Sequence, residues 1–368
     1  FNGFARFAYV TFGGNTSFVN SFFGNGADFS HIRFSGKDVD VIDFWYTKFN
    51  APSEVLFIDS DLRNVSFLYN NYISHFIFIN EKWRKRKYLL WRRKCLIDEE
   101  KIRKWREILD NIIESMIEKR KSTRIPSRVL REEEFVNMLM DKLGKEFRYR
   151  VPHPNHVAQL YRRLRDNFER NKRYHEAGDF FVGEMEAVRL EPSYRLWREI
   201  ASTKLRLLYI DLLLRGEVPA TDETGRKTKL VIAAGADAKN GTRKRIRLHL
   251  KKLYLKGRLL CCSLVGHLFI TILSPLWYYK VMALYGENYV LPVIWSSIII
   301  FVFGAVKAWK AGVTSWSLAT LSPYLVESLS AFFQFREVKS GLDILERLLG
   351  LLMLGLIFVS LRRKFERR

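Results

Sequence analysis

The sequence predicts a multidomain β + α membrane protein with three successive parts. Three observations predict it. Residues 1–80 carry a large apolar side chain at nearly every fifth position, which indicates a short-period β-solenoid. Residues 81–258 are strongly basic and mostly helical in pattern, and residues 259–368 contain two apolar segments of membrane-spanning length.

The two apolar segments, 289–308 and 342–361, are the predicted membrane spans. The first has no charge until Lys307, and the second is charged only in its first turn, at Asp343, Glu346 and Arg347. A bilayer core of roughly 30 Å takes about 20 helical residues to cross, and lipid satisfies no backbone hydrogen bonds. We therefore expect two spanning helices. The alternative is a pair of buried core helices in a soluble domain.

The repeat over residues 1–80 has its own internal order. Its predicted inward positions are Phe7, Phe12, Phe18, Phe23, Phe29, Phe34, Val39, Phe44, Phe49, Phe57, Leu62, Phe67, Tyr72 and Ile77. A small or β-branched residue mostly stands two positions before each of them. A period of five fits neither a helix nor an alternating strand, so each side of the predicted coil takes five residues.

This stretch resembles the pentapeptide-repeat family. The resemblance implies a right-handed quadrilateral β-helix of three to four coils. Some members of that family mimic DNA and inhibit topoisomerases, which requires an acidic surface. A chain with a net charge of +23 does not fit that role.

Between the solenoid and the membrane domain, the pattern predicts a basic helical linker or cap region over residues 81–258. The expected elements are a helix over 81–121, a linker over 122–128, a helix over 131–147, a helical hairpin over 155–190, a helix over 193–215 and a loop over 216–241. The hairpin resembles one that follows pentapeptide repeats in a family of membrane proteins, through Ala177, Gly178, Asp179, Phe180, Gly183, Glu184 and Glu186. We expect Asp179, Glu184 and Glu186 to pair with Arg162, Arg163 or Arg165.

Residues 243–258 give the strongest indication of lipid binding in the sequence. The segment has eight Lys and Arg residues and no acid, and it precedes the apolar part of the chain. Such juxtamembrane segments bind anionic lipids. The predicted headgroup-binding residues are Arg243, Lys244, Arg245, Arg247, Lys251 and Lys252. A plain solvated linker is the alternative.

The charge distribution also predicts the topology of the membrane domain, residues 259–368. Basic stretches precede residue 259 and follow residue 361, so both flanks are expected in the cytoplasm and the number of spans between them is even. We therefore predict a multi-pass protein of the cell membrane with cytoplasmic N- and C-termini. Residues 259–284 are predicted as an interfacial helix, although a further span stays open.

The C-terminal module resembles the two-span, ion channel 2-type domain, through Tyr285-Gly286-Glu287 and the segment 345–368. The resemblance implies a re-entrant pore helix, which falls to residues 321–336, with Glu327, Ser330 and Gln334 as pore-lining candidates. Potassium filters use a Thr-Val-Gly-Tyr-Gly loop. Gln334-Phe335-Arg336-Glu337 lacks it, so potassium selectivity is not expected.

The predicted function is an oligomeric ion-channel-like membrane protein whose solenoid binds or senses a cytoplasmic ligand or protein in signalling. Its predicted partners are anionic lipids and further copies of the chain, because two spans cannot enclose a pore alone. The alternative is a membrane-anchored scaffold without conductance, and a nucleic-acid binder is less favoured. No nucleophile–base or metal-ligand pattern stands out, so we predict no enzyme, catalytic residue, metal or cofactor.

Overall fold

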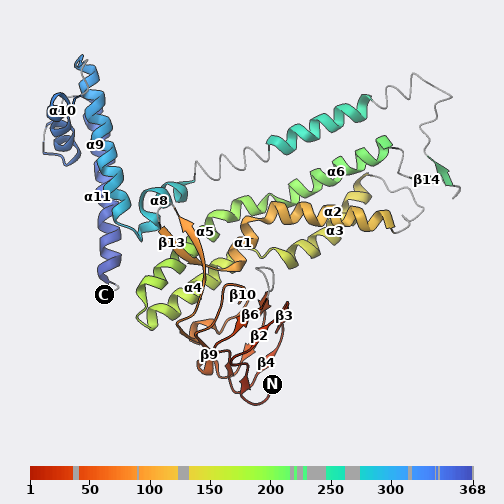
Figure 1. Cartoon of the computed structure of the whole chain (residues 1–368). Helices are drawn as coiled ribbons and strands as arrows, with labels where there is room; N and C mark the ends of the chain where they lie inside the picture. Colours follow the sequence, from red (N-terminus) through yellow and green to blue (C-terminus); the bar gives the residue numbers. More distant parts are fainter. Residues whose placement is uncertain are drawn as a thin grey trace. The chain divides into compact units, whose positions relative to one another are not determined.

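The computed structural model describes residues 1–35, 41–88, 91–122, 132–215, 219–221, 227–229, 246–261, 274–313, 317–335, 337–338 and 340–366. The chain forms two compact units, which are described separately: unit 1 is Phe1–Asn167 with Asp179–Leu273, and unit 2 is Phe168–Gly178 with Ser274–Arg368. An N-terminal β-solenoid, a helical middle and two membrane-capable helices confirm the predicted β + α architecture (Figure 1).

The solenoid makes about three turns of short strands. The strands are β1 (Ala5–Arg6), β2 (Thr11–Phe12), β3 (Thr16–Ser17), β4 (Phe22–Phe23), β5 (Ala27–Asp28), β6 (Arg33–Phe34), β7 (Ile42–Asp43), β8 (Lys48–Phe49), β9 (Val55–Ile58), β10 (Val65–Ser66) and β11 (Ile77–Ile79). They pair in parallel as four ladders, β1-β5-β9-β11, β2-β6, β3-β7-β10 and β4-β8. Four ladders give the coil the four sides that the resemblance to pentapeptide repeats implies.

Stacked phenylalanines fill the solenoid. In one stack, the ring centroids of Phe7, Phe29, Phe57 and Phe78 follow each other at 5.0, 5.2 and 5.5 Å. A second stack, through Phe18, Phe44 and Phe67, has spacings of 5.0 and 5.5 Å. Each fully buried ring contributes about 1.5–3 kcal/mol to stability, so the aromatic repeat supplies most of the core.

The predicted register fails in the last turn. Tyr72 and Ile77 were expected inside, but Ile73 and Phe76 are buried there and Ile77 is exposed. The one-turn 3-10 helix η2 (Ile73–His75) shifts the phase of the repeat. A second such turn, η1 (Pro52–Glu54), lies in the longer step between the inward positions Phe49 and Phe57. The predicted inward Val39 lies outside the described residues.

A β-hairpin, β12 (Arg84–Tyr88) with β13 (Trp91–Cys95), follows the solenoid, so the helix predicted over 81–121 is wrong in its first part. The helical pattern begins only with α1 (Ile97–Arg103) and α2 (Trp105–Ser122). The exposure of β12 alternates with the period of two that a strand requires: the Arg side chains are half-buried and the Lys side chains are exposed.

The remaining elements of the helical middle are α3 (Glu132–Arg150), α4 (Pro154–Arg170), α5 (Tyr174–Arg195), α6 (Trp197–Arg215), β14 (Pro219–Thr221), β15 (Lys227–Lys229) and a helix over residues 246–261. Helices α2, α3 and α6 share one apolar core that includes Leu109, Leu143, Phe147 and Leu205. The predicted hairpin is confirmed as α4 and α5, joined where Lys172 has a positive φ of 58°. Most of the predicted linker 122–128 and loop 216–241 lies outside the described residues.

Unit 2 contains α8 (Pro275–Ala283), the 3-10 turn η3 (Leu284–Gly286), α9 (Val290–Lys310), α10 (Leu318–Phe332) and α11 (Gly341–Glu366). Within the described residues, two helices are long and apolar enough to cross a membrane, Val290–Lys310 and Gly341–Arg363, and only 22% of the apolar window of each is buried. Core helices of a soluble domain are mostly buried, so this exposure favours lipid as their surroundings. The predicted interfacial helix 259–284 is described only as far as residue 261 and from residue 274 onward.

Candidate functional site

Two glycines bring α10 against both long helices of unit 2. A Cβ atom on Gly304 of α9 would lie 2.7 Å from Leu325 Cδ2, and one on Gly350 of α11 would overlap the backbone oxygen of Phe332. At Gly350 the obstructing atom is backbone, so only glycine permits the approach, whereas at Gly304 a shift of the Leu325 side chain would relieve the closest contact. Gly350 therefore packs inside the unit, and nothing lies within 4 Å of a Cβ placed on Gly355 of the same helix.

A buried ionic cluster links the same three helices. Lys307 Nζ of α9 lies 2.9 Å from Asp343 Oδ1 and 2.8 Å from Glu346 Oε2 of α11. The Ser328 hydroxyl of α10 contacts both Glu346 Oε1 and, at 2.8 Å, the carbonyl oxygen of Ile300. We call Lys307, Ser328, Asp343 and Glu346 the Lys307 cluster. Buried charges are costly unless they are paired, so the three ionic groups hold α9 to α11, and Ser328 attaches α10 to both helices.

The Tyr285-Gly286-Glu287 motif forms a tight turn at the other end of the long helices. Leu284, Tyr285 and Gly286 have positive φ angles of 46°, 58° and 81°. Arg363 Nη1 near the end of α11 donates a 2.7 Å hydrogen bond to the Tyr285 carbonyl and lies 3.6 Å from Glu287. The turn therefore fixes the C-terminal part of α11 beside the start of α9.

The three predicted pore-lining residues lie on or just after the second half of α10. Glu327 is half-buried, and the Ser330 hydroxyl donates to the Val326 carbonyl at 2.7 Å. Gln334 follows the helix with a positive φ of 63° and an exposed side chain. Their role in a pore stays a prediction.

The structure separates the predicted headgroup residues into groups. Arg243, Lys244 and Arg245 lie outside the described residues, and Arg247 is exposed on the helix 246–261. Lys251 pairs with Glu132 of α3, and Lys252 pairs with Asp211 of α6. These two lysines therefore hold the helix against its own unit, a use that the sequence did not show.

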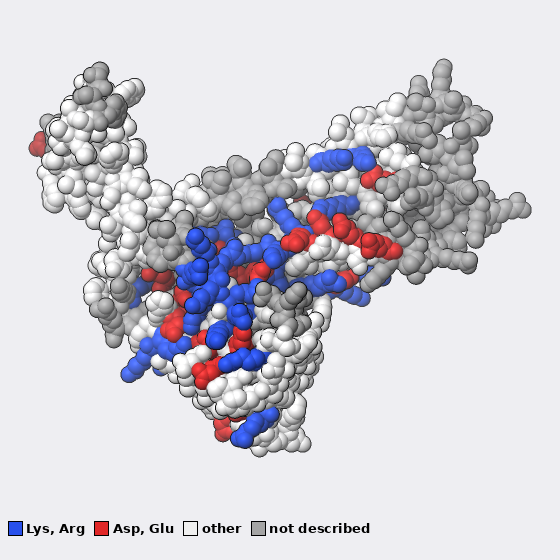
Figure 2. Space-filling view, viewed as in Figure 1, with Lys and Arg blue, Asp and Glu red and all other residues white. Residues whose placement is uncertain are grey.

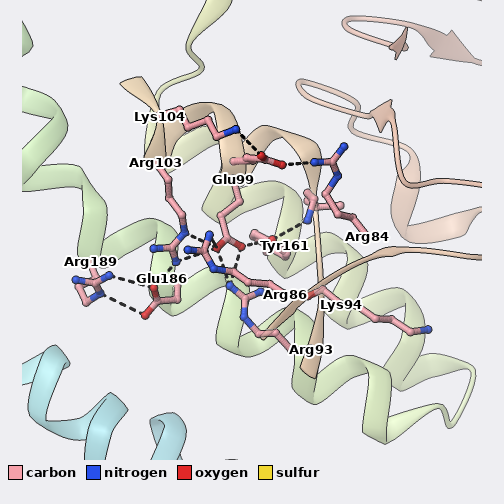
Figure 3. Close-up of polar contacts among 12 residues, drawn as sticks. Arg84, Arg86, Arg93, Lys94, Glu99, Arg103, Lys104, Tyr161, Glu186 and Arg189 are labelled. Carbon is pink, nitrogen blue, oxygen red and sulfur yellow. Dashed lines mark hydrogen bonds and ion pairs between the residues drawn. The ribbon is translucent and has the colours of Figure 1, made fainter. Parts of the chain in front are cut away.

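A second buried ionic network, shown in Figure 3, joins β13 and α1, which follow the solenoid and are called its cap here, to the helical hairpin α4–α5. Glu99 of α1 accepts hydrogen bonds of 2.7 and 2.8 Å from Arg93 of β13, and Tyr161 Oη of α4 donates to it at 2.5 Å. Arg103 donates to Glu99 at 2.9 Å and also pairs with Glu186 of α5, which Arg189 contacts at 3.1 Å. We call Arg93, Glu99, Arg103, Tyr161, Glu186 and Arg189 the Glu99 network.

The predicted pairing inside the hairpin is partly confirmed. Glu184 binds Arg162 and Arg165, at 2.8 and 2.7 Å. Arg163 instead donates to the Asn70 carbonyl of the solenoid at 2.9 Å. The Asp179 carboxylate accepts the backbone N–H of Lys94 at 3.1 Å, so the expected acidic residues mostly attach the hairpin to the cap.

Burial shifts several pKa values in this region. Burial alone would raise the pKa of Glu99, but Arg93 and Arg103 outweigh it and lower that pKa. Burial raises the pKa of Asp98, whose carboxylate accepts hydrogen bonds of 2.8 and 2.9 Å from Ser66 Oγ. Burial also raises the pKa of Cys95 to about 11, so its thiol stays protonated and has the low reactivity of a structural cysteine.

Positive charge and uncharged surface lie on different parts of the chain. Figure 2 shows Lys and Arg gathered over the β-hairpin and the helical middle, and few charged atoms on the visible face of the long helices of unit 2. In the β-hairpin β12–β13, Lys85 lies opposite Lys94 and Lys87 lies opposite Arg92. Among the described residues, no group of three or more His, Cys, Asp or Glu side chains is arranged to hold a metal ion.

Comparison of the chain with protein-family models, with curated proteins and with solved structures finds no match. The resemblance to pentapeptide-repeat and ion-channel proteins therefore stays an expectation from the sequence.

Proposed function

We propose that the chain is one subunit of an oligomeric, ion-channel-like membrane protein, and that its solenoid is a cytoplasmic binding or sensing domain. One observation carries the proposal. A 15-residue helix, α10, lies between two membrane-capable helices and packs against the middle of both. A simple membrane anchor needs no such helix.

The contacts of α10 support a re-entrant path. The Lys307 cluster places the end of α9 and the start of α11 at one level. Ser328, which belongs to the cluster, also contacts the carbonyl of Ile300, seven residues before Lys307 on α9, so this part of α10 runs along α9 toward its middle. The last residue of α10, Phe332, contacts Gly350, which lies beyond the cluster on α11. In this proposal α10 enters the bilayer from the end that carries the cluster and stops inside it.

The loop after α10 would then start at membrane depth. Backbone without helical hydrogen bonds is tolerated there only where it is buried in protein or lines a water-filled cavity. Gln334 and Phe335 are exposed within the described part of the single chain, so neighbouring subunits would have to complete their surroundings. This argument supports an oligomer with an axis beside the end of α10.

The outer surfaces of α9 and α11 suit lipid. Large apolar side chains are exposed along both helices, among them Ile294, Ile298, Phe301, Leu348, Leu351 and Phe358. Contiguous apolar surface of this kind marks a membrane or protein contact. The basic flanks at residues 243–258 and 361–368 support cytoplasmic N- and C-termini through the positive-inside tendency.

Conductance across a planar bilayer tests the proposal. The purified oligomer is expected to conduct, and Glu327→Gln is expected to lower cation conductance several-fold, because it removes a negative charge from the pore helix. Glu337→Gln is the matched control, since it removes the same charge from an exposed position after α10 and should change conductance little. An assembled oligomer that never conducts, over a wide range of voltages, would favour the membrane-anchored scaffold instead.

A further inference from the structure

The helix over residues 246–261 exposes an apolar stripe that nothing in the described part of the chain covers. Its exposed apolar residues are Ile246 (53%), Leu250 (60%), Leu253 (69%), Tyr254 (68%) and Leu260 (62%). At 100° per residue these five positions fall within about a third of the helix circumference. Five large apolar side chains on one face of a surface helix are unfavourable in water.

The opposite face of the helix is already occupied. Leu255 is buried, and Leu259 packs against the core shared by α2, α3 and α6. Lys251 and Lys252 pair with Glu132 and Asp211. These contacts set the rotation of the helix. Ile246, Leu250, Leu253 and Tyr254 lie on the outward side, and Leu260, at the end of the stripe, also borders a pocket lined by α2 and α6.

Cations border the stripe on both sides. Arg247 and Arg258 lie along one edge, and Lys256 lies along the other. Within the described residues, none of these three forms an ion pair with a carboxylate. An apolar stripe bordered by Lys and Arg is the pattern of a helix that lies in a membrane interface.

We propose that the helix 246–261 lies on an anionic membrane surface, with the five apolar side chains among the lipid chains and Arg247, Lys256 and Arg258 on lipid phosphates. Charge complementarity favours an anionic leaflet over an apolar protein partner. Only residues 262–273 separate the helix from the unit with the membrane-capable helices, so a bilayer is within reach along the chain. The inference needs a membrane but not a conducting pore, so it stands apart from the channel proposal.

This assignment changes the predicted headgroup contacts. Lys251 and Lys252 are used inside the unit, and the lipid contacts pass to Arg247, which was predicted, and to Lys256 and Arg258, which were not. The apolar stripe adds a contribution that a purely electrostatic segment lacks.

Fluorescence of single labelled cysteines in the full chain tests the inference. With Cys261 and Cys262 changed to serine, an environment-sensitive label is placed at Leu250→Cys or Leu253→Cys, and at Tyr9→Cys on the solenoid as an aqueous control. The chain is reconstituted in vesicles of phosphatidylcholine with phosphatidylglycerol. Labels at 250 and 253 should be quenched by shallow nitroxide lipids and protected from iodide several-fold better than the label at 9.

Charge variants separate lipid contact from general attraction. Replacing Arg247, Lys256 and Arg258 together by glutamine should reduce lipid quenching several-fold, and pure phosphatidylcholine should have a similar effect. The matched control replaces Lys85, Lys87 and Arg92 on the β-hairpin by glutamine, which removes the same charge and should leave the signal unchanged. Iodide access at 250 and 253 equal to that at 9 would overturn the inference. Protection from iodide without lipid quenching would also overturn it, since a second copy of the chain would then cover the stripe.

Discussion

Replacing Lys307 by methionine is expected to destabilise unit 2 by about 3–5 kcal/mol, because the change leaves buried carboxylates without their cation. The side chains of Lys307, Asp343 and Glu346 are exposed by only 10%, 8% and 0%. The change should also loosen α10, since Ser328 is bound to Glu346. Resistance of the reconstituted chain to SDS, followed by circular dichroism, measures the loss.

Two further variants show whether this loss comes from the ionic cluster. Lys310→Met removes an exposed lysine three residues on and should cost little. Combining Lys307→Met with Asp343→Asn and Glu346→Gln should recover much of the lost stability, because no buried charge then remains. If Lys307→Met and Lys310→Met were equally stable, the Lys307 cluster would not hold unit 2 together.

Glu99→Gln is expected to destabilise unit 1 by about 3–5 kcal/mol, because it leaves the guanidinium group of Arg93 buried without its carboxylate. Arg93 is 2% exposed and Glu99 is fully buried. Since the Glu99 network joins β13, α1, α4 and α5, the solenoid cap and the hairpin should loosen together (Figure 3). Urea unfolding in mild detergent, followed by tryptophan fluorescence, measures this change. Glu114→Gln, at an exposed position of α2, is the matched control and should change stability little.

The difference in unfolding free energy between wild type and Glu99→Gln should also depend on pH. The pKa of Glu99 is lowered in the folded chain, so its stabilising contribution is complete above its ordinary value of 4.5 and is lost as the pH falls through the folded value. The stability difference between wild type and Glu99→Gln should therefore shrink on acidification. Asp98, whose pKa is raised, is present in both proteins, so the difference isolates Glu99. A difference that grew toward low pH would show that the pairing with Arg93 is wrong.

The five-residue period predicted the solenoid because it records which side chains point inward, and inward packing is what the coil requires. The period did not reveal the backbone conformation at the corners, where the chain turns from one side of the coil to the next. Positive φ angles recur two residues after inward positions, as at Tyr9, His31, Tyr46 and Tyr69, where no glycine marks the turn. Outer rings stack there instead, with Tyr9 on His31 at 4.3 Å and Tyr46 on Tyr69 at 4.6 Å.

The hairpin β12–β13 was missed for a different reason. Its residues are so uniformly basic that apolar periodicity carries almost no signal, and the carboxylates that bind its inner face, Glu99 and Glu100, come later in the chain. The contacts within the Lys307 cluster and the Glu99 network could not be predicted from the sequence for a related reason. Lys307 and Glu346 are separated by 39 residues and Arg103 and Glu186 by 83, and nothing in either local pattern shows which charges meet.

Sidedness of labelling tests most directly whether α9 and α11 cross a membrane. Trp309 near the end of α9 and Phe365 near the end of α11 are both exposed. In a Cys261→Ser and Cys262→Ser background, Trp309→Cys should react with an impermeant maleimide added to intact cells, and Phe365→Cys should react only after permeabilisation. The polypeptide should stay with the membranes after an alkaline wash. Reaction of both cysteines from one side, or release of the polypeptide by the wash, would contradict the account.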